Sequence, residues 1–133
     1  MATILIIDDD ADVRDTLALV LEEAGHKTVM AKSGADGARK FGETRPQLVL
    51  TDIIMPESDG LEAMSAIRAL DPTVRIIAMS GASFAGSGYY LKLAKRFGAA
   101  AVLPKPFEPE ELVSTVERCL AAPPTEETSG ATQ

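Results

Sequence analysis

The chain has 133 residues, of which 46% are hydrophobic and 25% are charged, and its formal net charge at pH 7 is −7. This size and composition are typical of one globular domain with a full core, and they exclude a disordered chain. The acidic balance argues against direct binding to nucleic acid or to an acidic membrane, and no apolar run approaches the ~18 residues of a membrane span.

The first predicted elements are a strand and a helix that meet at three consecutive carboxylates. Residues 4–7 form a short apolar run typical of a strand, and Asp8, Asp9 and Asp10 follow it. Asp10 or a neighbouring residue is expected to cap the next helix, and Gly25 is expected to end it. The apolar face of this helix, at the helical period, comprises Val13, Leu17, Val20, Leu21 and Ala24.

The central part of the chain contains the strand that ends on a lone carboxylate. A weaker strand over residues 28–31 and a short helix over residues 35–42 come first. Residues 48–51 are apolar without polar alternation, which predicts a strand buried on both faces, and Asp52 follows them. Pro56 stiffens the loop behind Asp52, and Asp59 is expected to begin a third helix. The predicted apolar stripe of that helix is Leu61, Met64, Ile67 and Leu70.

The last third of the chain adds two strands and two helices. Residues 75–79 predict a strand that ends at Ser80, followed by a small-residue loop over 81–88 and a helix over 89–97. A fifth strand over residues 100–103 is followed by Lys105 between two prolines, and Pro109 suits the first turn of a fifth helix. The predicted buried stripe of this helix is Leu112, Val116, Cys119 and Leu120.

Five strands that alternate with five helices predict an α/β fold, a doubly wound five-stranded parallel sheet with right-handed crossovers. We expect one domain over residues 1–121 and a disordered tail or linker over residues 122–133. Cys119 is the only cysteine, so no internal disulfide is possible. No signal peptide is visible, and a cytoplasmic location is therefore expected.

Polar side chains follow four of the predicted strands, at the ends that meet at one edge of a parallel sheet. They are two carboxylates after the first strand, one after the third, a hydroxyl and an ammonium: Asp8, Asp9, Asp52, Ser80 and Lys105. Converging carboxylates repel one another unless a cation or protons intervene, and oxygen ligands suit Mg²⁺, Mn²⁺ or Ca²⁺ rather than zinc. Each residue alone also has an ordinary interpretation as a cap, a structural serine or a surface lysine, but together they favour phosphoryl chemistry.

The same residues carry a resemblance to a known family. The motifs Ile6-Ile7-Asp8-Asp9-Asp10, Asp52 with Met55-Pro56 and Asp59-Gly60, Ser80, and Lys105-Pro106-Phe107 resemble the receiver domain of two-component response regulators. The resemblance covers roughly residues 3–121. It implies a flavodoxin-like fold with strand order 2-1-3-4-5.

The resemblance also implies a role for each site residue. Asp52 would be the phosphoacceptor for a histidine kinase or a histidine phosphotransfer protein, Ser80 the switch hydroxyl and Lys105 the cation that pairs with the phosphate. The implied Mg²⁺ ligands are Asp8, Asp9, Asp52 and the backbone carbonyl of Ile54. A cis peptide is implied between Lys105 and Pro106.

The implied output is a phosphorelay signal rather than turnover of a substrate. A downstream protein would bind the face formed by helix four, strand five and helix five, and the domain would catalyse only its own phosphorylation and dephosphorylation. One departure from the family pattern is Val102, which stands where many members have an aromatic switch residue.

Two alternatives remain at this stage. A phosphohydrolase of the haloacid-dehalogenase type also uses an Asp nucleophile and Mg²⁺, but it would need an acid two residues after Asp52, where Ile54 stands. A phosphorylation-independent binding module would keep the fold without the chemistry, and the complete set of site residues argues against it. His26 has no partner in the pattern and is interpreted as structural or solvated, and Cys119 as a core residue.

Overall fold

The structure is a computed structural model that describes residues 2–53, 60–80, 92, 95–96 and 98–122. Five strands and four complete helices lie within these residues. Their order is β1 (Thr3–Ile7), α1 (Ala11–Glu23), β2 (Lys27–Ala31), α2 (Gly34–Thr44), β3 (Leu48–Asp52), α3 (Gly60–Leu70), β4 (Arg75–Ser80), β5 (Ala101–Pro104) and α5 (Pro109–Ala121).

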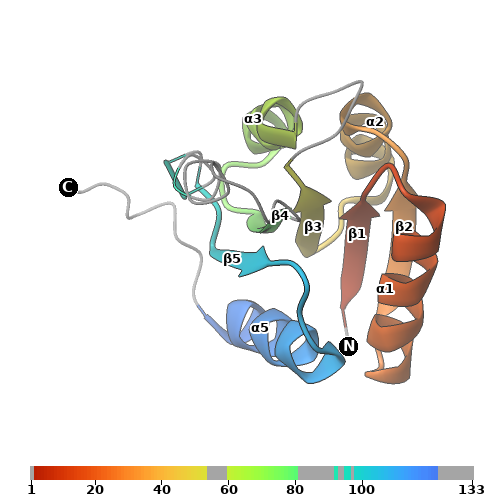
Figure 1. Cartoon of the computed structure of the whole chain (residues 1–133). Helices are drawn as coiled ribbons and strands as arrows, with labels where there is room; N and C mark the ends of the chain where they lie inside the picture. The colour runs from red at the N-terminus through yellow and green to blue at the C-terminus, as the bar shows by residue number, and fades with distance from the viewer. Residues whose placement is uncertain (1, 54–59, 81–91, 93–94, 97, 123–133) are drawn as a thin grey trace.

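The strands form one parallel sheet in the order β2-β1-β3-β4-β5 (Figure 1). The central strand β3 is buried at all five positions, as its apolar sequence predicts for a strand covered on both faces. In the register between β1 and β3, Ile7 lies opposite Thr51. The predicted doubly wound, flavodoxin-like fold and its strand order are confirmed.

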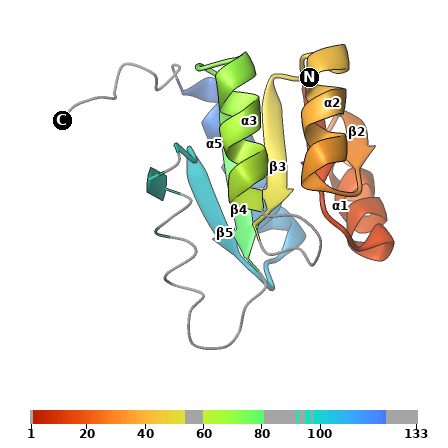
Figure 2. The same cartoon turned by 90° about the horizontal axis from the view of Figure 1, so that it is seen from above.

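Helices cover both faces of the sheet, with α1 and α5 on one face and α2 and α3 on the other (Figures 1 and 2). Successive strand residues point to opposite faces, so Leu5 and Ile7 belong to one core cluster and Ile4 and Ile6 to the other. The two apolar layers position the strand ends, because the inner strands β1, β3 and β4 are buried between them along most of their length.

Three predicted helix ends are confirmed, whereas the helix predicted over residues 35–42 extends over Gly34–Thr44. The carboxylate of Asp10 accepts hydrogen bonds from the backbone N–H groups of Asp12 and Val13 at the start of α1. Gly25 follows this helix with a φ of +99°, in the left-handed region that glycine adopts readily. Pro109 is the first residue of α5.

Some details of the predicted core and elements are wrong. Ala24 and Leu70 are exposed, because each lies at the end of its helix, where little of the sheet lies opposite. The fifth strand begins and ends one residue later than predicted and includes Pro104, which an edge strand tolerates. Thr115 on α5 is buried, although the predicted buried stripe of this helix did not include it because its side chain is polar.

Other expectations fall outside the described residues. These are the loop with Pro56 and Asp59, the side chain of Leu61, the loop over residues 81–88 and the tail from residue 123. Of the helix expected over residues 89–97, only Lys92, Lys95 and Arg96 are described, and all three are helical and exposed. Among the helices described, none has the length and apolar character that crossing a membrane requires.

Candidate functional site

Three carboxylates converge at the carboxyl edge of the sheet. Asp8 and Asp9 directly follow β1, and Asp52 ends β3. Because the two strands are paired neighbours, the residues that follow the Ile7–Thr51 pair lie side by side. One oxygen from each of the three groups lies within 4.8 Å of the others. Asp8 and Asp52 are buried, whereas Asp9 is exposed, so the cluster opens toward solvent on one side.

Lys105 lies between the two buried carboxylates. Its Nζ is 3.0 Å from Oδ2 of Asp8 and 3.3 Å from Oδ2 of Asp52. Burial works against the charged form of Lys105, but the neighbouring Asp52 and Asp8 outweigh it and raise the pKa of this lysine. Among the described residues, this cluster pairs one ammonium with three carboxylates, and such a shortage of positive charge is the electrostatic condition for binding a divalent cation.

The three consecutive aspartates have three different environments. The Oδ1 of Asp8 accepts a hydrogen bond from the backbone N–H of Asp10 at 3.0 Å, which orients the Asp8 side chain. The carboxylate of Asp10 points to the start of α1 as its cap and is outside the cluster. Arg14 donates to the backbone carbonyl of Asp8 at 2.7 Å. This contact was missing from the sequence interpretation, because an arginine on the first turn of a helix carries no signal of its target.

Ser80 and Lys105 come to the same edge through the pairing of β4 with β5. Ser80 is the last residue of β4 and is only 1% exposed. It lies opposite Pro104 in the register, and the Lys105 N–H donates to the Ser80 carbonyl at 2.8 Å. The peptide between Lys105 and Pro106 is cis, as the resemblance implies. The carbonyl of Ile54 lies outside the described residues.

The donor set fits a hard divalent cation. Within the part of the chain that the structure describes, the converging residues offer carboxylate oxygens and no sulfur or imidazole nitrogen, which is the ligand chemistry of Mg²⁺, Mn²⁺ and Ca²⁺. The oxygens are close enough for one ion to contact all three groups. The fold and site therefore define a doubly wound α/β protein with an acidic, cation-competent site at its switch point.

The family is known from comparison with characterised proteins. The response regulator receiver domain family matches residues 4–117, and the chain belongs to this family. It is a receiver domain of two-component response regulators, a signalling domain rather than a classical enzyme. Val102, the departure from the family pattern, is half-buried and packs against the core cluster beneath α2 and α3.

Relatives of this chain differ in length. Chemotaxis protein CheY of Listeria monocytogenes is 31% identical, over 89% of this chain and 98% of that protein. Response regulator receiver protein CpdR of Brucella abortus is 34% identical, over 92% of this chain and 99% of that protein. The transcriptional regulator NtrC of Azospirillum brasilense is 38% identical over 90% of this chain, but the chain spans only 24% of its length.

A solved structure shows the same arrangement of elements. The receiver domain of NtrX from Brucella abortus superimposes with a TM-score of 0.82 at 32% identity, covering 95% of this chain and 99% of that one. In a longer NtrX structure, with a TM-score of 0.83, the matched region is 27% of that chain. The relatives thus include single receiver domains and receiver domains within larger regulators.

Proposed function

We propose that the chain accepts a phosphoryl group on Asp52 from a histidine kinase or a histidine phosphotransfer protein. The observation that supports this most is the position of the Asp52 carboxylate, at the end of the central strand, 3.3 Å from Lys105 and beside two further carboxylates. A carboxylate oxygen of Asp52 forms a bond to phosphorus while the bond from phosphorus to the donor's histidine nitrogen breaks. The electron pair of that bond stays on the ring nitrogen, so the step needs no redox partner.

Asp8, Asp9, Asp52 and the carbonyl of Ile54 are the proposed ligands of Mg²⁺. When bound, the ion offsets negative charge on the carboxylates and on the incoming phosphoryl oxygens. Asp8 contributes a fixed oxygen, because its carboxylate is held by the Asp10 N–H and by Lys105. Asp9 is exposed and contributes its oxygen from the solvent side.

Lys105 and Ser80 stabilise the phosphorylated form in this proposal. The Lys105 ammonium already contacts Asp52 and can pair with an oxygen of the attached phosphoryl group. Ser80 lies on the neighbouring strand end, and its hydroxyl is the proposed switch donor to that group. The rearrangement would alter the face of helix four, β5 and α5, on which a downstream protein binds. A domain of this kind catalyses only its own phosphorylation and dephosphorylation.

We propose that the receiver unit comprises residues 1–121, with residues 122–133 as a tail or linker. The family match ends at residue 117 and α5 ends at Ala121, which supports this boundary. The partner kinase and the downstream protein imply action in the cytoplasm.

Intact-protein mass spectrometry tests the phosphoacceptor. With Mg²⁺ and acetyl phosphate, the wild-type protein should gain the mass of one phosphoryl group, and Asp52→Asn should gain none. Asp15→Asn is the matched control, because Asp15 is an exposed carboxylate on α1 outside the cluster, and it should be phosphorylated as the wild type is. A phosphorylated Asp52→Asn protein, or an unmodified wild type, would contradict the proposal.

A further inference from the structure

A pocket of about 440 Å³ lies at the β2 edge of the sheet, between the first half of α1 and α2. The two helices flank β2 from opposite faces of the sheet (Figures 1 and 2). Its volume lies within the range of small-molecule sites. The pocket shares no lining residue with the carboxylate cluster, so this β2-edge pocket is a separate feature of the molecule.

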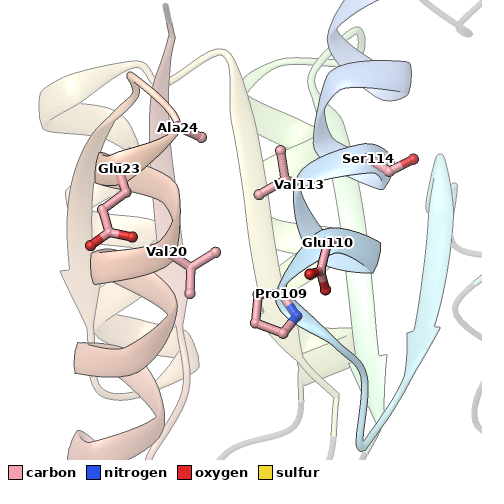
Figure 3. Close-up of a pocket in the computed structure, with 7 residues that line it drawn as sticks. All are labelled: Val20, Glu23, Ala24, Pro109, Glu110, Val113 and Ser114. Carbon is pink, nitrogen blue, oxygen red and sulfur yellow. The ribbon is translucent and has the colours of Figure 1, made fainter.

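The β2-edge pocket is positively charged, although the chain as a whole has a net charge of −7. Among the described residues that line it, the cations are Arg14, Lys32, Arg39 and Lys40, and the carboxylates are Asp15 and Asp36. Four cations against two carboxylates leave a formal charge of +2. The groove between α1 and α5, by contrast, is lined by Glu23 and Glu110 among small and apolar side chains (Figure 3). The positive charge is therefore a local property of the β2 edge.

Asp36 is already bonded within the pocket. Its carboxylate pairs with Arg39, lies 3.5 Å from Nζ of Lys40 and accepts a hydrogen bond from the backbone N–H of Lys32 at 3.2 Å. The Asp36 side chain is 11% exposed, whereas that of Arg39 is 60% exposed and also lies 3.5 Å from Glu43. Asp36 thus holds the cations of α2 in place and presents little of its own charge to a ligand.

The cations have hydrogen-bond donors to offer a ligand. Arg14 donates from Nη1 to the Asp8 carbonyl at 2.7 Å, and Lys40 donates to the Met30 carbonyl at 2.7 Å. A guanidinium has five N–H donors and an ammonium has three, so each of these groups can bond a second partner. Lys32 directly follows β2 and is exposed. Arginine and lysine together are the donor set that proteins use for phosphate groups.

We propose that the β2-edge pocket binds a small phosphate monoester. Such a group carries a charge of about −1.5 to −2 at pH 7, which matches the formal charge of the pocket. The phosphate oxygens accept hydrogen bonds from Lys32 and Arg39, with Arg14 on the opposite side. Met30 is 37% exposed, and its flexible side chain offers an apolar contact to the carbon skeleton of the ester.

The surrounding charge disfavours larger anions. A nucleic acid or an acidic protein would extend beyond the pocket and meet a surface whose overall charge is negative. A small ester stays within the positive region. Binding of this ester is separate from phosphoryl transfer, because it uses neither Asp52 nor Lys105.

Nuclear magnetic resonance titration of the ¹⁵N-labelled protein tests the pocket. The probe is adenosine monophosphate in buffer with EDTA, so that no metal ion can bridge the phosphate to the carboxylate cluster. The nucleotide should shift the amide signals of Met30, Lys32, Arg39 and Lys40, and its affinity should fall as salt is raised. Adenosine, which lacks the phosphate, should not bind. Inorganic phosphate, which lacks the carbon skeleton, should bind about fivefold more weakly.

Charge variants separate the pocket from the rest of the surface. Lys32→Gln combined with Arg39→Gln should weaken nucleotide binding about tenfold, and both residues are exposed, so the fold should be retained. Lys27→Gln is the matched control, because Lys27 is exposed at the other end of β2 and does not line the pocket. It should leave the affinity unchanged. Asp52→Asn should also bind the nucleotide normally, which distinguishes a failure here from a failure of the phosphoacceptor proposal.

Four results would overturn the proposal. They are absence of nucleotide binding, equal binding of adenosine, signal shifts that centre on the carboxylate cluster, and an unchanged affinity of the double glutamine variant. Inorganic phosphate that binds as tightly as the nucleotide would overturn the assignment to an ester, because Met30 would then contribute nothing.

Discussion

At the scale of single residues, the three consecutive aspartates at the acidic site have different environments and different roles. Asp8 is buried and held by a backbone N–H and by Lys105, while Asp9 is exposed. Asp10, the next residue, caps α1 and stays outside the cluster. The crowding of like charges costs stability whenever no cation offsets it, so the charge of each member can be tested separately.

Asp9→Asn should raise the melting temperature in EDTA by about 2–4 °C, because it removes one of three mutually repelling charges. With saturating Mg²⁺ the order should reverse, since the wild type gains stability from the bound ion and the variant gains less. Differential scanning calorimetry in both buffers measures this. Asp10→Asn is the matched control, because asparagine also caps a helix, and it should not stabilise the protein. A melting temperature of Asp9→Asn at or below the wild type in EDTA would argue against a strained cluster.

Lys105→Met should lower the free energy of unfolding at neutral pH without metal by about 2–3 kcal/mol, because it removes the cation that contacts two buried carboxylates. The folded protein raises the pKa of Lys105 above its ordinary value of 10.5. Its stabilising effect is therefore fully present below pH 10.5 and is lost as pH rises through the folded-state pKa.

Urea unfolding of the wild type and of Lys105→Met as a function of pH measures the difference between their free energies of unfolding. It should stay constant from about pH 7 to about pH 10 and shrink at higher pH. A difference that already declines between about pH 7 and pH 9 would show that a group other than Lys105 dominates.

At the scale of elements, the approach of α2 to β1 depends on one glycine. A Cβ on Gly37 would lie 2.4 Å from Cδ1 and 2.8 Å from Cγ1 of Ile7, a buried residue of β1. Ile7 directly precedes Asp8, so the packing of α2 also supports the strand end that carries the acidic site. Gly42, on the same helix, has no atom within 4 Å of such a Cβ.

Gly37→Ala should therefore destabilise the protein by about 1–2 kcal/mol, because the free-energy cost of repacking Ile7 exceeds the stabilisation from the higher helix propensity of alanine. Gly42→Ala is the matched control and should stabilise the protein by up to about 1 kcal/mol, since it gains propensity without a clash. Urea unfolding measures both. Equal effects of the two substitutions would mean that Ile7 adapts at no cost.

At the scale of the whole molecule, His26 joins segments that are far apart in the chain. Its Nδ1 accepts a hydrogen bond from the Ala2 N–H at 3.1 Å, and its Nε2 lies 2.9 Å from Oε2 of Glu117 on α5. The imidazole is buried, whereas the Glu117 side chain is 56% exposed. His26 is therefore structural, with one partner beside β1 and another 91 residues away.

His26→Leu should lower the free energy of unfolding by about 1–3 kcal/mol, because the buried N–H of Ala2 loses its acceptor. Glu117→Gln should cost less than about 1 kcal/mol, since this partner is largely solvated and glutamine keeps an acceptor oxygen. Chemical denaturation of both variants gives the comparison. A His26→Leu protein as stable as the wild type would remove His26 from the contacts that hold the two ends together.

Local sequence patterns predicted most of the fold and the chemistry of the site. The apolar run before Asp52, the cap at Asp10 and the stop at Gly25 were readable because each depends on a few adjacent residues. The convergence of Asp8, Asp9 and Asp52 followed from a general property of parallel sheets, provided that strands one and three are neighbours. The prediction that strands one and three are adjacent rested on the family resemblance, since the residues themselves do not determine the order of the strands in the sheet.

Tertiary structure alone decided how segments distant in the sequence meet. The pairing of His26 with Glu117 and the contact of Arg14 with the Asp8 carbonyl depend on strand register and helix packing. The exposure of Leu70 was also not predictable from the local sequence, because the helical period of apolar residues continues to the last turn whether or not a sheet lies beneath it. Periodicity and capping act over a few residues, whereas burial is set by what the completed fold places opposite each side chain.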